Sequence, residues 1–157
     1  MSDLTENQQE TMNFLENKQE LNLNYTSSEI SHLKDVKGVM NFIDYLFYLS
    51  LIIITLIITY YKKNKKQLIK LFRYGGITTL ISMGIILFLS LFAFNTTFTI
   101  FHQIFFPQGN WLFPTNSLLI QTFPIEFFIG ISVRMFGLGI LLGMVLVLVN
   151  SLLKKKS

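Results

Sequence analysis

Three long apolar runs constrain the fold of this chain more than any other feature of its sequence. Residues 42–61 form a twenty-residue run interrupted by one aspartate near its start, and residues 75–94 form a second run without any charge. The third, residues 125–153, contains Arg134, yet the part beyond this arginine is uncharged and long enough to cross a membrane alone. About 20 residues of helix span the hydrocarbon of a bilayer. The sequence therefore predicts an all-α integral membrane protein with three transmembrane helices.

Basic residues beside these runs set the expected orientation. They cluster after the first and third runs, at Lys62, Lys63, Lys65, Lys66, Lys70, Arg73, Lys154, Lys155 and Lys156. Basic loops remain on the cytoplasmic side of a membrane, so with three spans the polar amino-terminal arm and the loop between the last two spans must lie together outside the cell. These two segments form the expected small extracellular cap.

The predicted segments follow from the runs and the orientation. They are an extracellular polar arm, 1–40; a first transmembrane helix, 41–61; a cytoplasmic basic loop, 62–74; a second transmembrane helix, 75–95; an extracellular aromatic cap loop, 96–124; a third transmembrane helix, 125–153; and a cytoplasmic basic tail, 154–157. In the third helix, Gly139 and Gly143 have the spacing that permits close packing of two helices.

Composition excludes several kinds of chemistry. The chain has no cysteine, so disulfides, thiolate nucleophiles and Cys-based metal sites are impossible. Serine motifs of the GxSxG type and histidine pairs of the HExxH or HxxxH type do not occur. We expect no cofactor and no metal; a site built from both histidines with Glu29 or Asp35 is the less favoured alternative.

The net charge of +4 reflects lysines that flank the spans, so nucleic acid is not expected as a partner. Membrane lipid is. We expect the lysines of the basic loop to contact anionic lipid, because each lysine near such a surface contributes about 1 kcal/mol. These lysines are Lys62, Lys63, Lys65 and Lys66.

One of the two histidines lies on a predicted helix with two acidic neighbours. Thr26 and Glu29 have the spacing of a capping box, so a helix should begin near Ser27 and run through His32 into the first span. Glu29 and Asp35 then lie three residues to either side of His32 and share its face. Either carboxylate could orient the imidazole and prepare it as a general base. The alternative is a solvated helix with ordinary ion pairs.

The other histidine, His102, lies in a segment unusually rich in phenylalanine. If the second transmembrane helix continued past Phe94, His102 would stand about 12 Å above its end, level with His32. The topology thus predicts that both histidines come together in the cap. Within the arm, alternation of Leu21, Leu23 and Tyr25 with polar residues is typical of a short strand.

Two motifs around these histidines resemble those of a known family. Glu29-Ile-Ser-His32-Leu-Lys-Asp35 precedes the first span, and Phe101-His102-Gln-Ile-Phe105-Phe106 follows the second, with Trp111 and Phe123-Pro124 beyond it. Their order and their spacing to the spans resemble the lipoprotein intramolecular transacylase family of Gram-positive bacteria. The resemblance covers roughly residues 25–150.

The resemblance implies a fold of four transmembrane helices with an extracellular cap, and a location in the bacterial cell membrane. It also implies transfer of an acyl chain from the glyceryl sn-2 oxygen of a diacylglyceryl lipoprotein to the amino-terminal cysteine nitrogen, which gives the lyso form. Diacylated lipoproteins and membrane lipid are the implied partners. The implied catalytic pair is His32 and His102. Substrate binding and orientation fall to Glu29, Asp35, Phe101, Phe105, Phe106 and Trp111.

The roles of the two histidines can be assigned in either order. In the first, His102 is the base that acts on the amine, and His32 with Asp35 donates a proton or stabilises the oxyanion. The chain departs from the family pattern because the family's first transmembrane helix is absent, and a truncated start or a partner chain that supplies the helix would explain this. A truncated inactive homologue and a non-enzymatic membrane accessory or scaffold protein are therefore alternatives to the enzyme.

Overall fold

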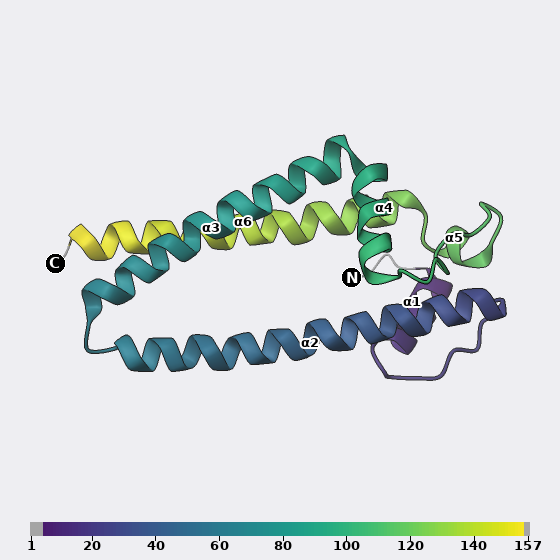
Figure 1. Ribbon diagram of the computed structural model, residues 1–157, viewed down its shortest axis with the longest axis horizontal. Helices are drawn as coiled ribbons and strands as arrows, with labels where there is room; N and C mark the ends of the chain where they lie inside the picture. Colours follow the sequence, from purple (N-terminus) through teal and green to yellow (C-terminus); the bar gives the residue numbers. More distant parts are fainter. Residues whose placement is uncertain (1–4, 156–157) are drawn as a thin grey trace. The chain divides into compact units, whose positions relative to one another are not determined.

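The computed structural model describes residues 5–155, and of residues 149–155 it describes the backbone only. This part of the chain is all helical and contains no strand (Figure 1). Its helices are α1 (Glu6–Leu15), α2 (Ser27–Tyr61), α3 (Lys65–Phe92), α4 (Phe94–Phe105), α5 (Leu118–Thr122) and α6 (Ile125–Lys155). Three of them, α2, α3 and α6, are long and apolar enough to cross a membrane. The predicted all-α class with three membrane-spanning helices is confirmed.

The start of α2 matches the capping box found in the sequence. The backbone nitrogen of Thr26 donates to Glu29 Oε2 at 2.7 Å, and the backbone nitrogen of Glu29 donates to Thr26 Oγ1 at 3.3 Å. The helix then continues without interruption to Tyr61. Its first fifteen residues bury Glu29, His32 and Leu33, whereas every side chain from Asn41 to Tyr60 is exposed, as a lipid-facing surface would be.

The expected continuous helix from the second span through His102 is wrong. Helix α3 ends at Phe92, Ala93 leaves helical geometry with φ −136° and ψ 38°, and α4 begins at Phe94. Asn and Thr side chains compete with the helix for backbone partners, and Thr97 Oγ1 here donates to the carbonyl of Leu89 at 3.4 Å. At its other end α3 begins earlier than predicted, because the Asn64 side chain accepts the backbone nitrogen of Gln67 at 3.2 Å.

The expected strand over residues 21–25 is also wrong, since that segment is irregular. Tyr25 is buried while Leu21 and Leu23 are half-buried against the same core. The alternation in the sequence therefore reflects burial of every second side chain. A strand needs a partner for its backbone hydrogen bonds, and no partner strand exists among residues 5–155.

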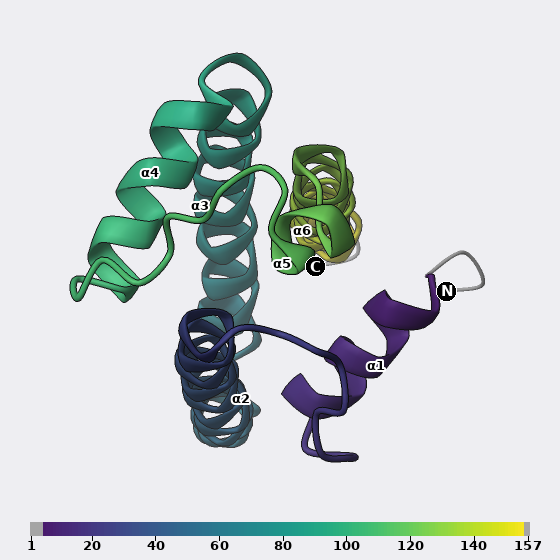
Figure 2. The ribbon, with the colours of Figure 1, turned by 90° about the vertical axis from the view of Figure 1, so that its right-hand side faces the viewer.

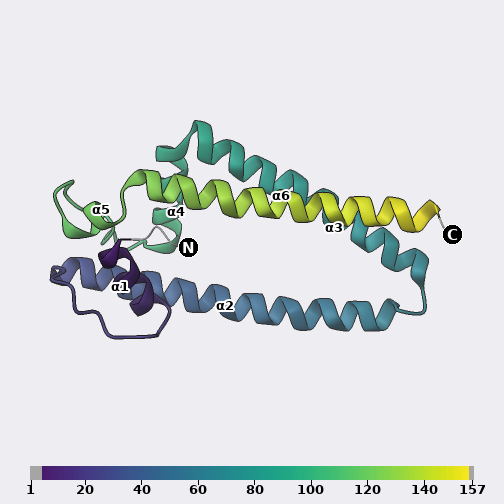
Figure 3. The same cartoon turned by 180° about the vertical axis from the view of Figure 1, so that it is seen from behind.

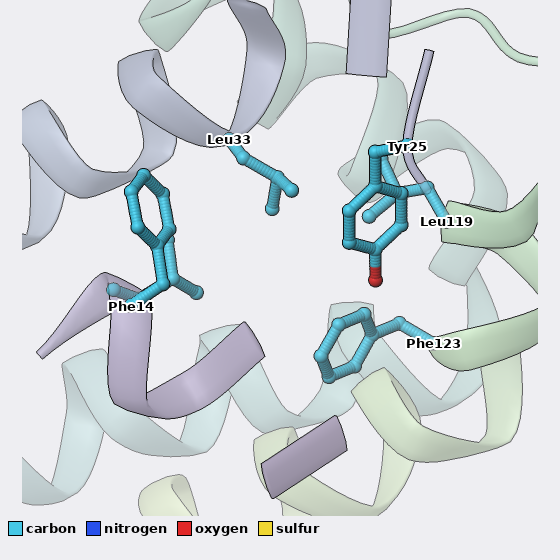
Figure 4. Close-up of a cluster of buried hydrophobic side chains, with 6 residues drawn as sticks. Phe14, Tyr25, Leu33, Leu119 and Phe123 are labelled. Atoms are coloured by element: carbon cyan, nitrogen blue, oxygen red, sulfur yellow. The ribbon is translucent and has the colours of Figure 1, made fainter. Parts of the chain in front are cut away.

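The chain forms two compact units. The first comprises residues 1–47 and 98–128, and the second comprises residues 48–97 and 129–157. The core of the first unit joins α1, the start of α2 and α5 (Figures 2 and 4). Its buried apolar side chains are Phe14, Leu15, Tyr25, Leu33, Leu119 and Phe123. Beside them the Tyr25 hydroxyl bonds to Thr11 Oγ1 at 2.9 Å and to Thr122 Oγ1 at 3.4 Å.

Helices α3 and α6 lie side by side in the second unit (Figures 1 and 3). A Cβ atom at Gly76 would meet the carbonyl oxygen of Gly143 at 2.9 Å, and one at Gly143 would meet Leu80 Cγ at 2.9 Å. A Cβ atom at Gly139 would meet Met83 Cγ at the same distance. The prediction that Gly139 and Gly143 permit close helix packing is confirmed, and α3 is the partner.

Candidate active site

Both histidines belong to the first unit, and their rings face each other. The ring centroids of His32 on α2 and His102 on α4 are 6.0 Å apart, and the ring planes differ by 23°. Only 7% of His32 and 9% of His102 is exposed. The prediction that the two histidines come together is thus confirmed, even though the second span does not continue through His102.

Aromatic rings enclose the pair. Phe106, itself 3% exposed, contacts both imidazoles, with its ring centroid 4.8 Å from that of His32 and 5.5 Å from that of His102. The other ring centroids near an imidazole are those of Phe98, Trp111 and Phe101, at 3.9, 4.9 and 5.4 Å from His102, and of Phe113, at 5.5 Å from His32. The pocket around the imidazoles is therefore largely apolar.

Of the predicted substrate-contacting rings, Phe101, Phe106 and Trp111 touch His102. Phe105 does not touch either imidazole among the described contacts; it packs against Phe101 at 4.7 Å and is 40% exposed. The sequence reading missed Phe98 and Phe113. Phe98 lies four residues before His102 on the same helix, and this spacing alone could have identified it.

The hydrogen bond of His102 defines which of its nitrogens is basic. His102 Nδ1 lies 2.8 Å from the carbonyl oxygen of Phe98, and because a carbonyl only accepts, Nδ1 must carry the proton. Burial lowers the pKa of His102 below its usual value, and the bond to Phe98 acts in the opposite direction. A neutral His102 therefore keeps an unprotonated Nε2, which is what a general base needs.

His32 lies in the part of α2 that precedes the apolar run, and its surroundings are more polar on one side. Burial, together with the neighbouring His102, lowers the pKa of His32; the Asn110 side chain and the charge of Asp35 oppose this shift. The apolar pocket thus disfavours the imidazolium form of His32, and the negative charge of Asp35 partly stabilises it. His102 has no comparable carboxylate among the groups that act on its pKa.

The Asp35 carboxylate does not reach His32 directly. Its Oδ2 accepts from Gln108 Nε2 at 2.8 Å and from Asn110 Nδ2 at 2.5 Å. Asn110 thus bonds to the carboxylate, and its side chain also acts on the pKa of His32. In the sequence Asn110 looks like an ordinary turn residue after Gly109, and no local pattern distinguishes it.

Glu29 was expected to orient His32, but its contacts are elsewhere. The side chain is 1% exposed, its Oε1 accepts from the backbone nitrogen of Leu119 at 2.9 Å, and its Oε2 bonds to Thr26. This carboxylate therefore caps α2 and holds α5 to it. Glu29 makes no hydrogen bond to His32 or His102 among the described residues.

We expect Glu29→Ala to reduce the free energy of unfolding of the first unit by about 2–4 kcal/mol, because the buried donors of Thr26 and Leu119 would lose a charged acceptor. Trp111, the single tryptophan of the chain, belongs to this unit, so its fluorescence on heating the detergent-solubilised protein reports the change. Glu20→Ala, at an exposed position, serves as the control. Equal melting temperatures for both variants would contradict the capping role.

A metal site in a protein usually needs three or more donor side chains. Across residues 5–155 no three His, Cys, Asp or Glu side chains are grouped so that they could hold a metal ion. The site itself offers two imidazoles, which can take up and release protons near neutral pH.

Together the fold and the site define a multi-pass membrane protein with a buried histidine pair. Residues 1–128 match the family model described as "Lipoprotein intramolecular transacylase Lit". The match covers well over half of the chain, which therefore belongs to the lipoprotein intramolecular transacylase family and has a lipoprotein transacylase kind of function. A search of the curated proteins finds no match. A search of the solved structures finds none either.

Proposed function

We propose that this chain transfers the sn-2 acyl chain of a diacylglyceryl lipoprotein to the nitrogen of its amino-terminal cysteine and so forms the lyso form of the lipoprotein. The observation that carries the proposal is the buried pair of imidazoles, 6.0 Å apart, in a chain of this family. Lipoprotein substrate and a membrane setting follow from the family itself.

The reaction needs both a base and an acid. The α-ammonium loses a proton, its nitrogen attacks the sn-2 ester carbonyl, the bond from that carbon to the glyceryl oxygen breaks, and the nitrogen loses a second proton. The glyceryl oxygen takes up one proton, so one proton is released for each ester converted to an amide. Imidazole is the side chain whose ordinary pKa lies closest to neutrality, so a pair of histidines suits these steps.

The surroundings of the two rings favour one assignment of roles. His102 acts as the base on the amine, because its Nδ1 proton is held by the Phe98 carbonyl and its Nε2 lone pair is available. His32 donates a proton to the leaving glyceryl oxygen or stabilises the oxyanion. Burial lowers the pKa of His32, and the nearby charge of Asp35 opposes this shift, so His32 is the imidazole with a carboxylate to stabilise the protonated form that an acid must adopt.

The rings around the pair contribute by positioning and by exclusion of water. Phe101, Phe106 and Trp111 pack against His102 and would hold the ester and the amine in contact, for which effective molarities can be large. Phe105, being exposed, would meet the acyl chains of the substrate or the surrounding lipid. Both nucleophile and ester belong to one substrate molecule, so no covalent enzyme intermediate is required.

The proposal includes an orientation in the bacterial cell membrane. The histidine pair lies at the extracellular face, where diacylated lipoproteins are anchored, and the basic loop lies in the cytoplasm. On the cytoplasmic side, the exposed lysines of the basic loop contact anionic lipid. These lysines are Lys62, Lys63, Lys65 and Lys66. These placements rest on the positive-inside rule.

The test is expression of this chain in a bacterial strain whose lipoproteins are diacylated, followed by mass spectrometry of a reporter lipoprotein's amino-terminal peptide. We expect one acyl chain to move from glycerol to the cysteine nitrogen, with the total peptide mass unchanged and the fragment ions shifted. An unchanged diacylglyceryl peptide, with the protein present in the membrane fraction, would favour an inactive homologue or an accessory protein.

A further inference from the structure

We propose that Asn110 is the positioning residue of His32: its amide nitrogen is fixed on Asp35, and its amide oxygen accepts the Nδ1 proton of His32. The catalytic consequence of this arrangement rests on the proposed transacylase function. The arrangement itself does not, because it concerns which ring nitrogen carries a proton.

The anchor on Asp35 determines which way the Asn110 amide points. A carboxylate only accepts hydrogen bonds, so the Asn110 atom 2.5 Å from Asp35 Oδ2 must be the nitrogen. The same nitrogen lies 3.4 Å from Ser31 Oγ, and Gln108 Nε2 donates to the same carboxylate oxygen at 2.8 Å. Asp35 and Ser31 thus hold one orientation of the amide, in which the Asn110 oxygen faces away from Asp35, and Gln108 holds the carboxylate.

Two buried polar atoms are left without a hydrogen-bond partner among the described residues: His32 Nδ1 and Asn110 Oδ1. The Asn110 side chain is close enough to His32 to act on its pKa. The two atoms are complementary only if Nδ1 carries the hydrogen, because an amide oxygen cannot donate. An unpaired buried polar group costs about 1–3 kcal/mol, so a hydrogen bond between these two atoms is favoured.

The inferred bond gives His32 the same tautomer as His102. His102 donates its Nδ1 proton to a backbone carbonyl, and His32 donates its Nδ1 proton to an amide carbonyl, so both Nε2 atoms remain free for the substrate. The neutral amide also separates Asp35 from the imidazole. The carboxylate can therefore stabilise a transient imidazolium without holding the proton permanently.

The turn before Asn110 brings its side chain to this place. Gly109 adopts a positive φ of 78°, and its backbone nitrogen donates to the carbonyl of Phe106 at 3.1 Å. A residue other than glycine is strained in this conformation. Phe106 contacts both imidazoles, so the same short turn carries one ring of the pocket and the amide that positions His32.

The first test is spectroscopic and needs no activity. The chain has two histidines, so ¹⁵N-histidine labelling of the full chain in detergent micelles gives two imidazole spin systems, assigned with single His32→Ala and His102→Ala samples. At a pH where both rings are neutral, we expect the Nδ1–H tautomer for both. Asn110→Ala should change the tautomer signature of His32 and leave that of His102 unchanged. Asn116→Ala, at an exposed position, should change neither.

The second test measures turnover of a synthetic diacylglyceryl lipopeptide in mixed micelles. We expect Asn110→Ala to lower the rate about 10- to 100-fold. Gln108→Ala, which removes a different amide from the same carboxylate, should keep the His32 tautomer. The double variant Asp35→Asn with Asn110→Asp moves the carboxylate next to His32 and reverses the amide–carboxylate bond, so it should be at least tenfold faster than Asn110→Ala.

The outcomes separate the two proposals. If the wild-type chain shows no turnover, the transacylase proposal fails, and the tautomer measurement still decides the role of Asn110. If the wild-type chain is active but Asn110→Ala leaves the His32 tautomer unchanged, the positioning role is overturned whatever happens to the rate. A double variant no faster than Asn110→Ala would also overturn it.

Discussion

His102→Ala is expected to lower the rate of acyl transfer by about 10²- to 10⁴-fold, which is the usual contribution of a positioned general base. The α-ammonium of the substrate is protonated near neutral pH, and His102 is the imidazole whose free nitrogen is defined by a hydrogen bond on its other side. The loss is measured as the amount of N-acylated lipopeptide formed per unit time by purified protein in mixed micelles.

A matched pair of variants separates loss of the base from loss of fold. His102→Gln keeps a polar side chain of similar length within the aromatic pocket and should be nearly as slow as His102→Ala. Gln103→Ala changes the next, exposed residue of α4 and should retain the wild-type rate. Turnover of His102→Ala within a factor of five of wild type would show that another group accepts the proton.

His32→Ala is the second change for which we expect a large loss, again about 10²-fold or more, since the leaving glyceryl oxygen would have to be protonated by water. In the proposed mechanism the two histidines act in the same reaction step. The double variant His32→Ala with His102→Ala should therefore be about as slow as the slower single variant, because groups that act as a unit are strongly non-additive.

Lys34→Ala is the control for His32, because Lys34 is exposed on the same helix. It should leave the rate unchanged. If His32→Ala proved as active as the Lys34 variant while His102→Ala was inactive, His32 would be part of the pocket wall only. If instead the two single losses multiplied in the double variant, the histidines would act independently, and the paired mechanism would be wrong.

Local patterns in the sequence predicted the helical elements well where the determinants are local. The capping box of Thr26 and Glu29 fixed the start of α2, and apolar run length identified the three membrane-spanning helices. The break at Ala93 was missed because nothing in the apolar run itself signals a stop. Only the later Thr97, which bonds back to Leu89, indicates it.

Some features of the candidate site could be predicted from the sequence and others could not. The histidine pair could be predicted because two histidines and one topology leave few arrangements, and His32 and His102 do lie together. The contacts of Glu29 could not be predicted. Spacing on α2 puts Glu29 on the face of His32, whereas its carboxylate oxygens accept hydrogen bonds from Leu119 and Thr26. Contacts between segments 90 residues apart are not indicated by any spacing pattern in the sequence. Asn110 was missed for the same reason.

The separation of the two imidazoles has a consequence for the order of events. Two positive charges 6.0 Å apart repel by about 3 kcal/mol at an effective dielectric constant of 20, and Asp35 offsets only one of them. In the proposed mechanism the pair therefore carries only one extra proton at a time, beyond the Nδ1 hydrogen of each neutral ring. If the chain acts as proposed, a second proton can leave the substrate nitrogen only once the first has been passed on, so repulsion between the two imidazoles would couple departure of the glyceryl oxygen to completion of the amide.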